Sequence, residues 1–145
     1  MAHASESYDL NRFVEAQEGD YEQALAELRA GRKRSHWMWY IFPQIEGLGF
    51  SSMSRRYAVK GRAEAEAYLA HPVLGPRLLE SAEAVLGVAG RSAHEILGSP
   101  DDLKLRSSAT LFAAVSAPGS VFEQVLRKYY REERDPETLR LLGAG

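Results

Sequence analysis

Apolar residues recur with the spacing of an amphipathic helix in most segments of this sequence, and the alternation typical of a strand is nearly absent. The first stripe stands at positions i, i+3, i+4 and i+7 and consists of Leu10, Phe13, Val14 and Gln17, of which Gln17 is the one polar member. A later one consists of Leu78, Leu79, Ala82, Val85 and Leu86. Such spacing places side chains on one face of a helix, so the sequence predicts an all-α protein.

Residues that begin and end helices divide the chain into short segments. Ser92 and Glu95 have the spacing of a capping box, in which each side chain satisfies a backbone N–H group of the helix start. Ser99 is expected to cap a further helix, with Pro100 at the first helical position. Gly31 is expected to end the second helix of the chain.

The length of 145 residues fits one domain. A chain of this length forms a core without help from disulfides or metals, and the predicted helices are joined by connections as short as those of a bundle. We therefore expect an all-α, compact single-domain bundle of about seven or eight short helices. It should span residues 9–143 and follow a flexible N-terminus at residues 1–8.

Composition and charge exclude several classes of protein. The chain has no cysteine, which rules out disulfides and thiolate ligands and suits a cytoplasmic protein. The net charge of −2 gives no general reason to bind nucleic acid or an anionic membrane. The opening ten residues show no leader, and no apolar run approaches the ~20 residues of a membrane span. The scattered histidines lack metal-ligand spacing, so we expect neither a metal nor a cofactor.

The segment SHWMWYIFPQ at residues 35–44 carries four aromatic residues between a basic run and a glycine-rich turn. On a helix no face of this segment would be polar, so it is either buried nearly all round or lines a cavity. Aromatic walls suit planar ligands, because a ring offers a face for stacking. The two interpretations are compatible, since small-ligand pockets are mostly apolar.

The segment at residues 101–116 is apolar on several sides, yet along its length it also carries Lys104, Arg106, Ser107, Ser108 and Thr110. A helix that is apolar all round is central in its domain, and a buried cation is costly unless it is paired. In one interpretation Asp101 pairs with Lys104, Asp102 pairs with Arg106, and the hydroxyls bond to backbone carbonyls. In the other, these groups face a cleft and bind an anionic or phosphorylated ligand.

Motifs of the common catalytic classes are missing. The sequence has no GxSxG elbow, no phosphate-binding loop and no dinucleotide fingerprint. His36 is the histidine in the most unusual setting, inside the aromatic segment, so it is our candidate for proton transfer.

Several motifs in one order resemble a bacterial family of unknown function, the domain-of-unknown-function 1810 family, often called calpastatin-like. They are DLNRFVEAQ, RKRSHWMWYIFPQIEGLGFSSMSRRYAV, AYLAHPVLGPRLLE and SPDDLKLRSSATLF. The resemblance covers residues 8–142 and implies a compact all-α domain but no reaction. Inhibition of the calpastatin type depends on flexible polar segments, whereas this chain is 45% hydrophobic with well-capped helices.

Two hypotheses for function follow. The first is a small-ligand site for a nucleotide-like or ADP-ribose-like compound, with hydrolysis as one candidate reaction, between the aromatic segment and the helix at 101–116. His36 would transfer protons, and the ligand-binding residues would be Trp37, Trp39, Phe42, Gln44, Lys104, Arg106, Ser107, Ser108 and Thr110. The alternative is a non-enzymatic protein-interaction module, in which the aromatic segment is the core or a patch for a partner.

Overall fold

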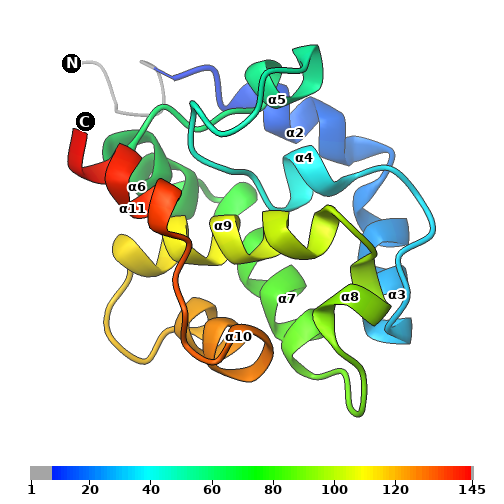
Figure 1. Cartoon of the computed structure of the whole chain (residues 1–145). Helices are drawn as coiled ribbons and strands as arrows, with labels where there is room; N and C mark the ends of the chain where they lie inside the picture. Colours follow the sequence, from blue (N-terminus) through cyan, green and yellow to red (C-terminus); the bar gives the residue numbers. More distant parts are fainter. Residues whose placement is uncertain (1–7, 145) are drawn as a thin grey trace.

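Helix α9 (Asp101–Ala114) crosses the middle of the protein in a computed structural model that describes residues 8–144 (Figure 1). It contacts α6 (Arg62–Ala70), α8 (Ala93–Leu97), α10 (Val121–Tyr130) and α11 (Pro136–Ala144). From Leu105 to Ala113 all its residues except Arg106 are buried, on every side of the helix. The prediction of a central helix in this segment is thereby confirmed.

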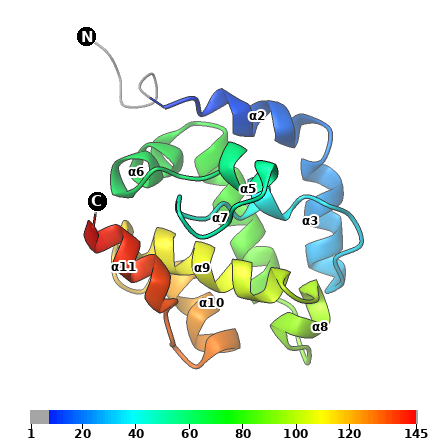
Figure 2. The same ribbon diagram turned by 45° about the horizontal axis from the view of Figure 1, so that its top comes forward.

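The remaining helices surround this centre (Figure 2). Helix α7 (Leu74–Leu86) packs against α3 (Tyr21–Ala30), α6 and α10, and α2 (Asn11–Glu18) contacts the single turn α4 (Met38–Ile41). A further single turn, α5 (Ser52–Arg56), precedes α6. The apolar residues buried between them form one continuous core. The prediction of an all-α single domain is therefore confirmed.

The described residues form ten helices, so the expected number of seven or eight was too low. The described helices include single turns such as α5, whose start is capped by the Ser51 hydroxyl, which accepts a bond from the Ser54 N–H. A one-turn helix is too short to show helical periodicity in the sequence. The described residues form no sheet, apart from one isolated parallel bridge between Ile45 and Val59.

Helix boundaries follow most of the expected signals. The Ser92–Glu95 capping box is formed, and Gly31 ends α3 with a positive φ of 74°. Ser99 does not cap α9: the preceding position is taken by Pro100, and the Asp102 N–H bonds to the Gly98 carbonyl instead. The expectation of a flexible terminus falls largely on residues 1–7, which lie outside the described part of the chain.

None of the helices at residues 8–144 combines the length and the apolar character that crossing a membrane requires.

Candidate functional site

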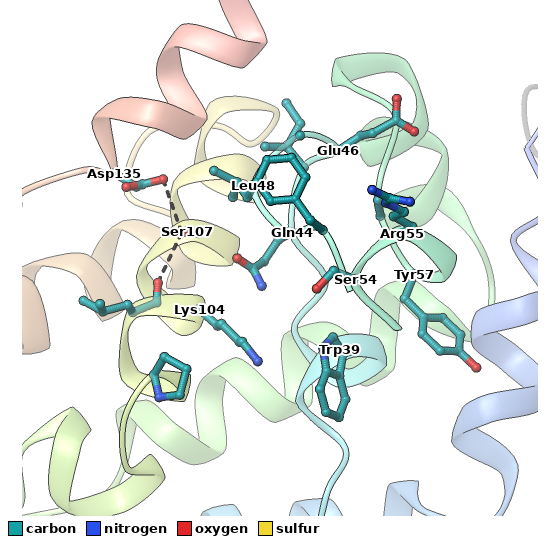
Figure 3. A pocket seen from close by; sticks show the side chains of 17 residues that line it. Trp39, Gln44, Glu46, Leu48, Ser54, Arg55, Tyr57, Lys104, Ser107 and Asp135 are labelled. Carbon is teal, nitrogen blue, oxygen red and sulfur yellow. Dashed lines mark hydrogen bonds between the residues drawn. The ribbon is translucent and has the colours of Figure 1, made fainter. Parts of the chain in front are cut away.

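A cavity of about 670 Å³ lies between the aromatic segment, the glycine-rich loop at residues 46–50, α5 and the first half of α9 (Figure 3). This volume is in the range of small-molecule sites. Its lining consists of Trp39, Gln44, Ile45, Glu46, Gly47, Leu48, Gly49, Phe50, Ser54, Arg55, Tyr57, Ala58, Pro100, Leu103, Lys104, Ser107 and Asp135.

The glycine-rich loop is held in place by two close approaches. A Cβ atom on Gly47 would lie 3.2 Å from the Leu141 side chain of α11, and φ at Gly47 is +106°. A Cβ atom on Gly49 would lie 2.5 Å from the Ser54 hydroxyl oxygen. Both positions therefore require glycine: the first for its backbone conformation as well as for space, and the second for space. The loop can lie close to α5 and α11 only because these side chains are absent.

The backbone that precedes this loop is fixed from the other side. The Val59 N–H donates to the Gln44 carbonyl at 2.8 Å, and the Glu46 N–H donates to the Val59 carbonyl at 2.7 Å. The segment around Val59 is itself anchored by the Arg12 guanidinium, which bonds to the Arg56 and Ala58 carbonyls at 2.7 Å each. The cavity wall thus depends on contacts from helix α2.

The carboxylate of Glu27, on α3, positions the start of the aromatic segment. It accepts hydrogen bonds from the backbone N–H groups of Arg34 and Ser35, the Ser35 hydroxyl, the Trp37 indole N–H and the Gln23 amide. Burial would raise the pKa of Glu27, but these hydrogen bonds outweigh it and lower the pKa to about 2. Glu27 is therefore ionised at neutral pH and holds Trp37 in the core.

Two lysines share one carboxylate at the edge of the cavity. The Asp101 carboxylate lies 3.0 Å from the Lys33 ammonium and 3.3 Å from the Lys104 ammonium. Each ammonium also lies over an indole ring, Lys33 at 5.3 Å from the centroid of Trp37 and Lys104 at 4.6 Å from that of Trp39. Two positive charges facing one negative charge leave an excess of one positive charge, and Lys104 is the lysine that lines the cavity.

The facing wall combines α9 with the start of α11. The Ser107 hydroxyl contacts the Leu103 carbonyl and an Asp135 carboxylate oxygen at 3.2 Å each. The same carboxylate oxygen of Asp135 accepts bonds from the Thr138 N–H and hydroxyl. Asp135 is thus the cap of α11, as the sequence Asp-Pro indicates.

Other polar groups of the lining have no hydrogen-bond partner within residues 8–144. They include three donors, the Trp39 indole N–H, the Gln44 amide and the Arg55 guanidinium, and also the Glu46 carboxylate and the Tyr57 hydroxyl. Figure 3 shows Gln44 and Lys104 converging on the space above Trp39. Together with the Lys104 ammonium the three donors make this part of the cavity suited to a ligand that carries an anion.

Four of the predicted site residues line the cavity: Trp39, Gln44, Lys104 and Ser107. Asp101 pairs with Lys104, as the internal-pairing interpretation expected, and yet Lys104 still faces the cavity. Internal pairing of Lys104 and its place in the cavity lining are therefore compatible, and ligand binding by Lys104 stays a prediction.

The other predicted site residues lie elsewhere. Trp37 and Phe42 are buried in the core, at 1% and 2% exposure, so these parts of the aromatic segment form no surface patch. Ser108 and Thr110 are also buried, and the Thr110 hydroxyl donates to the Arg106 carbonyl. These four side chains are absent from the cavity lining.

Arg106 and His36 also lie outside the cavity. The Arg106 guanidinium donates to the Glu133 and Arg134 carbonyls, at 2.8 and 2.9 Å, rather than pairing with Asp102. The pairing of Asp102 with Arg106 was predicted wrongly. It was predicted from the spacing of the two residues along one helix, but in the fold the chain before α11 approaches α9 and its carbonyls accept the bonds from Arg106. His36 is exposed to solvent and does not contribute to the lining.

Sequence reasoning missed part of the lining, notably Glu46, Phe50, Ser54, Arg55 and Asp135. The segment EGLGFSS offered a signal, because two closely spaced glycines followed by an aromatic residue are unusual in a plain connection. No local pattern could show that Asp135, nearly a hundred residues later, joins the same cavity.

The comparisons with known proteins give a family and a fold. Residues 7–142 match the family described as "Protein of unknown function (DUF1810)", which confirms the resemblance seen in the motifs. The chain is 51% identical to the conserved hypothetical protein Rv1873 from Mycobacterium tuberculosis, whose crystal structure it matches with a TM-score of 0.93, over 94% of this chain and 98% of that one. No curated protein matches it significantly. The function must therefore be argued from the site itself.

Proposed function

This chain belongs to the DUF1810 family of proteins of unknown function, and we propose that it binds a small anionic ligand, nucleotide-like or ADP-ribose-like, in the cavity beside Trp39 and Lys104. The observation that carries the proposal is the shared carboxylate of Asp101. With Lys33 and Lys104 both within 3.3 Å of it, the Lys104 ammonium is only partly neutralised.

The polar groups near Lys104 fit the same ligand chemistry. The Gln44 amide and the Trp39 indole N–H are donors without a partner among the described residues, so a phosphate or carboxylate would satisfy them. The backbone N–H groups at the start of α9 are not part of this set, because those of Asp102, Leu103 and Lys104 bond to the carbonyls of Gly98 and Pro100. The anion is held by side chains rather than by the helix terminus.

Our proposal is one of binding, with no proton-transfer role for His36. His36, the candidate for proton transfer, is exposed outside the cavity. A general acid or base has to come within hydrogen-bond reach of the reacting group.

The chain supplies a matched pair of variants for the test. Lys104→Met and Lys33→Met each remove one ammonium group from Asp101 and from the face of one tryptophan, but Lys104 alone of the two lines the cavity. Thermal unfolding is measured with ribose 5-phosphate, AMP and ADP-ribose at low salt. A ligand that binds only the folded state raises the unfolding temperature.

We expect at least one of these phosphates to stabilise the wild type and, to a smaller extent, Lys33→Met, because Asp101 neutralises Lys104 more completely once Lys33 is removed. Lys104→Met should bind at least tenfold more weakly, since a hydrogen bond to a charged group contributes about 1.5–3 kcal/mol. If none of the three compounds stabilises the wild type, or if both lysine variants lose binding equally, the anion site is refuted.

A further inference from the structure

Phe50 is the most exposed large apolar side chain of the described residues, at 76%, and it lines the cavity. Leu103, on α9, is 56% exposed and lines the same cavity. A single exposed apolar residue is ordinary on a protein surface. Phe50 and Leu103 come from segments about fifty residues apart in the chain. Together they form an apolar rim at the cavity, whose lining is polar near Lys104.

Phe50 is largely exposed and has no ring or cation on its face among residues 8–144, whereas Lys104 lies over one face of Trp39. The Lys104 ammonium lies 4.6 Å from the centroid of the Trp39 ring. Phe50 makes no ring–ring or cation–ring contact with any residue between 8 and 144, although six ring pairs and six cation–ring pairs occur there. A planar group of a ligand can therefore stack on Phe50 without displacing a protein contact, and stacking on the covered face of Trp39 would displace Lys104.

The position of Phe50 is fixed by its neighbours in the chain. Gly49 lies against Ser54 so closely that a Cβ atom would clash, and the Ser51 hydroxyl caps α5 directly after Phe50. The ring is therefore presented by a constrained turn between two packed points. A constrained backbone at this position limits the entropy that is lost when a ligand stacks on the ring.

We propose that Phe50 is the base-stacking residue of this site, so that a nucleotide binds with its phosphate inward at Lys104 and its base outward at the rim. The inference rests on the proposed function and goes beyond it by assigning the ligand's orientation and the residue that recognises its ring. Every base has a face for stacking, so this contact selects for a flat ring and not for one particular base.

The test compares AMP with ribose 5-phosphate, which has the phosphate and sugar but lacks the base. Calorimetric titration of the wild type should show AMP binding about tenfold more tightly than ribose 5-phosphate, the effect of one base–ring stacking contact. In Phe50→Ala this difference should disappear while the affinity for ribose 5-phosphate stays unchanged. Phe50→Tyr, which keeps the ring, should retain the preference for AMP.

Leu139→Ala is the control, because Leu139 is also an exposed apolar side chain, at 43%, and lies outside the cavity lining. It should leave both affinities unchanged. Stacking on Phe50 is refuted if the wild type binds AMP and ribose 5-phosphate equally, or if the preference for AMP survives in Phe50→Ala. In either case ribose 5-phosphate still binds, so the anion site stands. If neither compound binds, the stacking proposal fails, and the anion site fails with it when ADP-ribose does not stabilise the protein either.

Discussion

At the scale of single residues, buried charge in this protein is satisfied by hydrogen bonds as well as by ion pairs. Glu27 is buried and has no ion partner among the described residues, yet it accepts bonds from five donors of α3 and the aromatic segment. A carboxylate with several donors stays ionised in a buried site. Its charge fixes the path of the chain that leads to Trp39 and the cavity.

The lowered pKa of Glu27 predicts how stability depends on pH. The folded-state pKa of about 2 lies below the ordinary value of 4.5, so the stabilisation is fully present above pH 4.5 and is lost as the pH falls from there through 2. The whole contribution is at most about 3 kcal/mol. Urea unfolding of the wild type and of Glu27→Gln at several pH values measures it.

Glu27→Gln should be less stable than the wild type at pH 7. One of the two carboxylate oxygens that now accept hydrogen bonds would become an amide nitrogen, which cannot accept them. The difference in unfolding free energy between the two proteins should shrink between pH 4.5 and 2. A difference that stays constant over this range would contradict the assigned role of the Glu27 charge.

The sequence anticipated part of this residue-level picture. It required Lys104 and Arg106 to find partners because they stand on a largely buried helix, and both have them. The partner of Lys104 was predictable because Asp101 is three residues away on the same helix. The partners of Arg106 were not, because they are backbone carbonyls of residues 133 and 134, brought there only by the fold.

At the scale of elements, some helix boundaries depend on local interactions and others on tertiary contacts. The capping box at Ser92 and the Asp135 cap are local interactions, and the sequence predicted both. The single turns α4 and α5 have too few residues to be stable alone. Their form depends on packing against α2 and on the glycine-rich loop.

The close contact between that loop and α5 can be tested with a pair of glycines. Gly49→Ala would bring a Cβ atom to 2.5 Å from the Ser54 hydroxyl and 2.7 Å from its Cβ atom, so the loop must move. We expect a loss of about 1–3 kcal/mol in unfolding free energy, and a weaker stabilisation by AMP because Phe50 is displaced.

Gly19→Ala is the matched control. Gly19 has a negative φ, and a Cβ atom there would meet nothing within 4 Å. This variant should unfold at or slightly above the wild-type temperature and keep its response to AMP. Equal behaviour of the two variants in urea unfolding and thermal shift would show that the loop tolerates displacement.

At the scale of the whole molecule, one core connects every large element. Buried side chains from α2, α3, α6, α7, α9 and α10 belong to one cluster, and Trp37 lies within it. A single core of this size favours unfolding in one cooperative step.

We therefore predict coincident unfolding transitions by tryptophan fluorescence and by far-ultraviolet circular dichroism. Fluorescence reports the core through Trp37, and dichroism reports all helices. The variant Trp39→Phe removes the contribution of the cavity tryptophan. Two transitions with different midpoints in this variant would indicate separately unfolding parts.

The sequence by itself determined the helical class, most helix boundaries and the burial of α9, because these follow from spacing and capping within ten or so residues. It also marked Trp39, Gln44, Lys104 and Ser107 as candidates. Only the tertiary structure decided that Trp37 and Phe42 fill the core while Trp39 lines a cavity, and that Phe50 and Asp135 join it. A cavity is a gap between elements distant in the chain, and its shape depends on how they pack rather than on any local pattern.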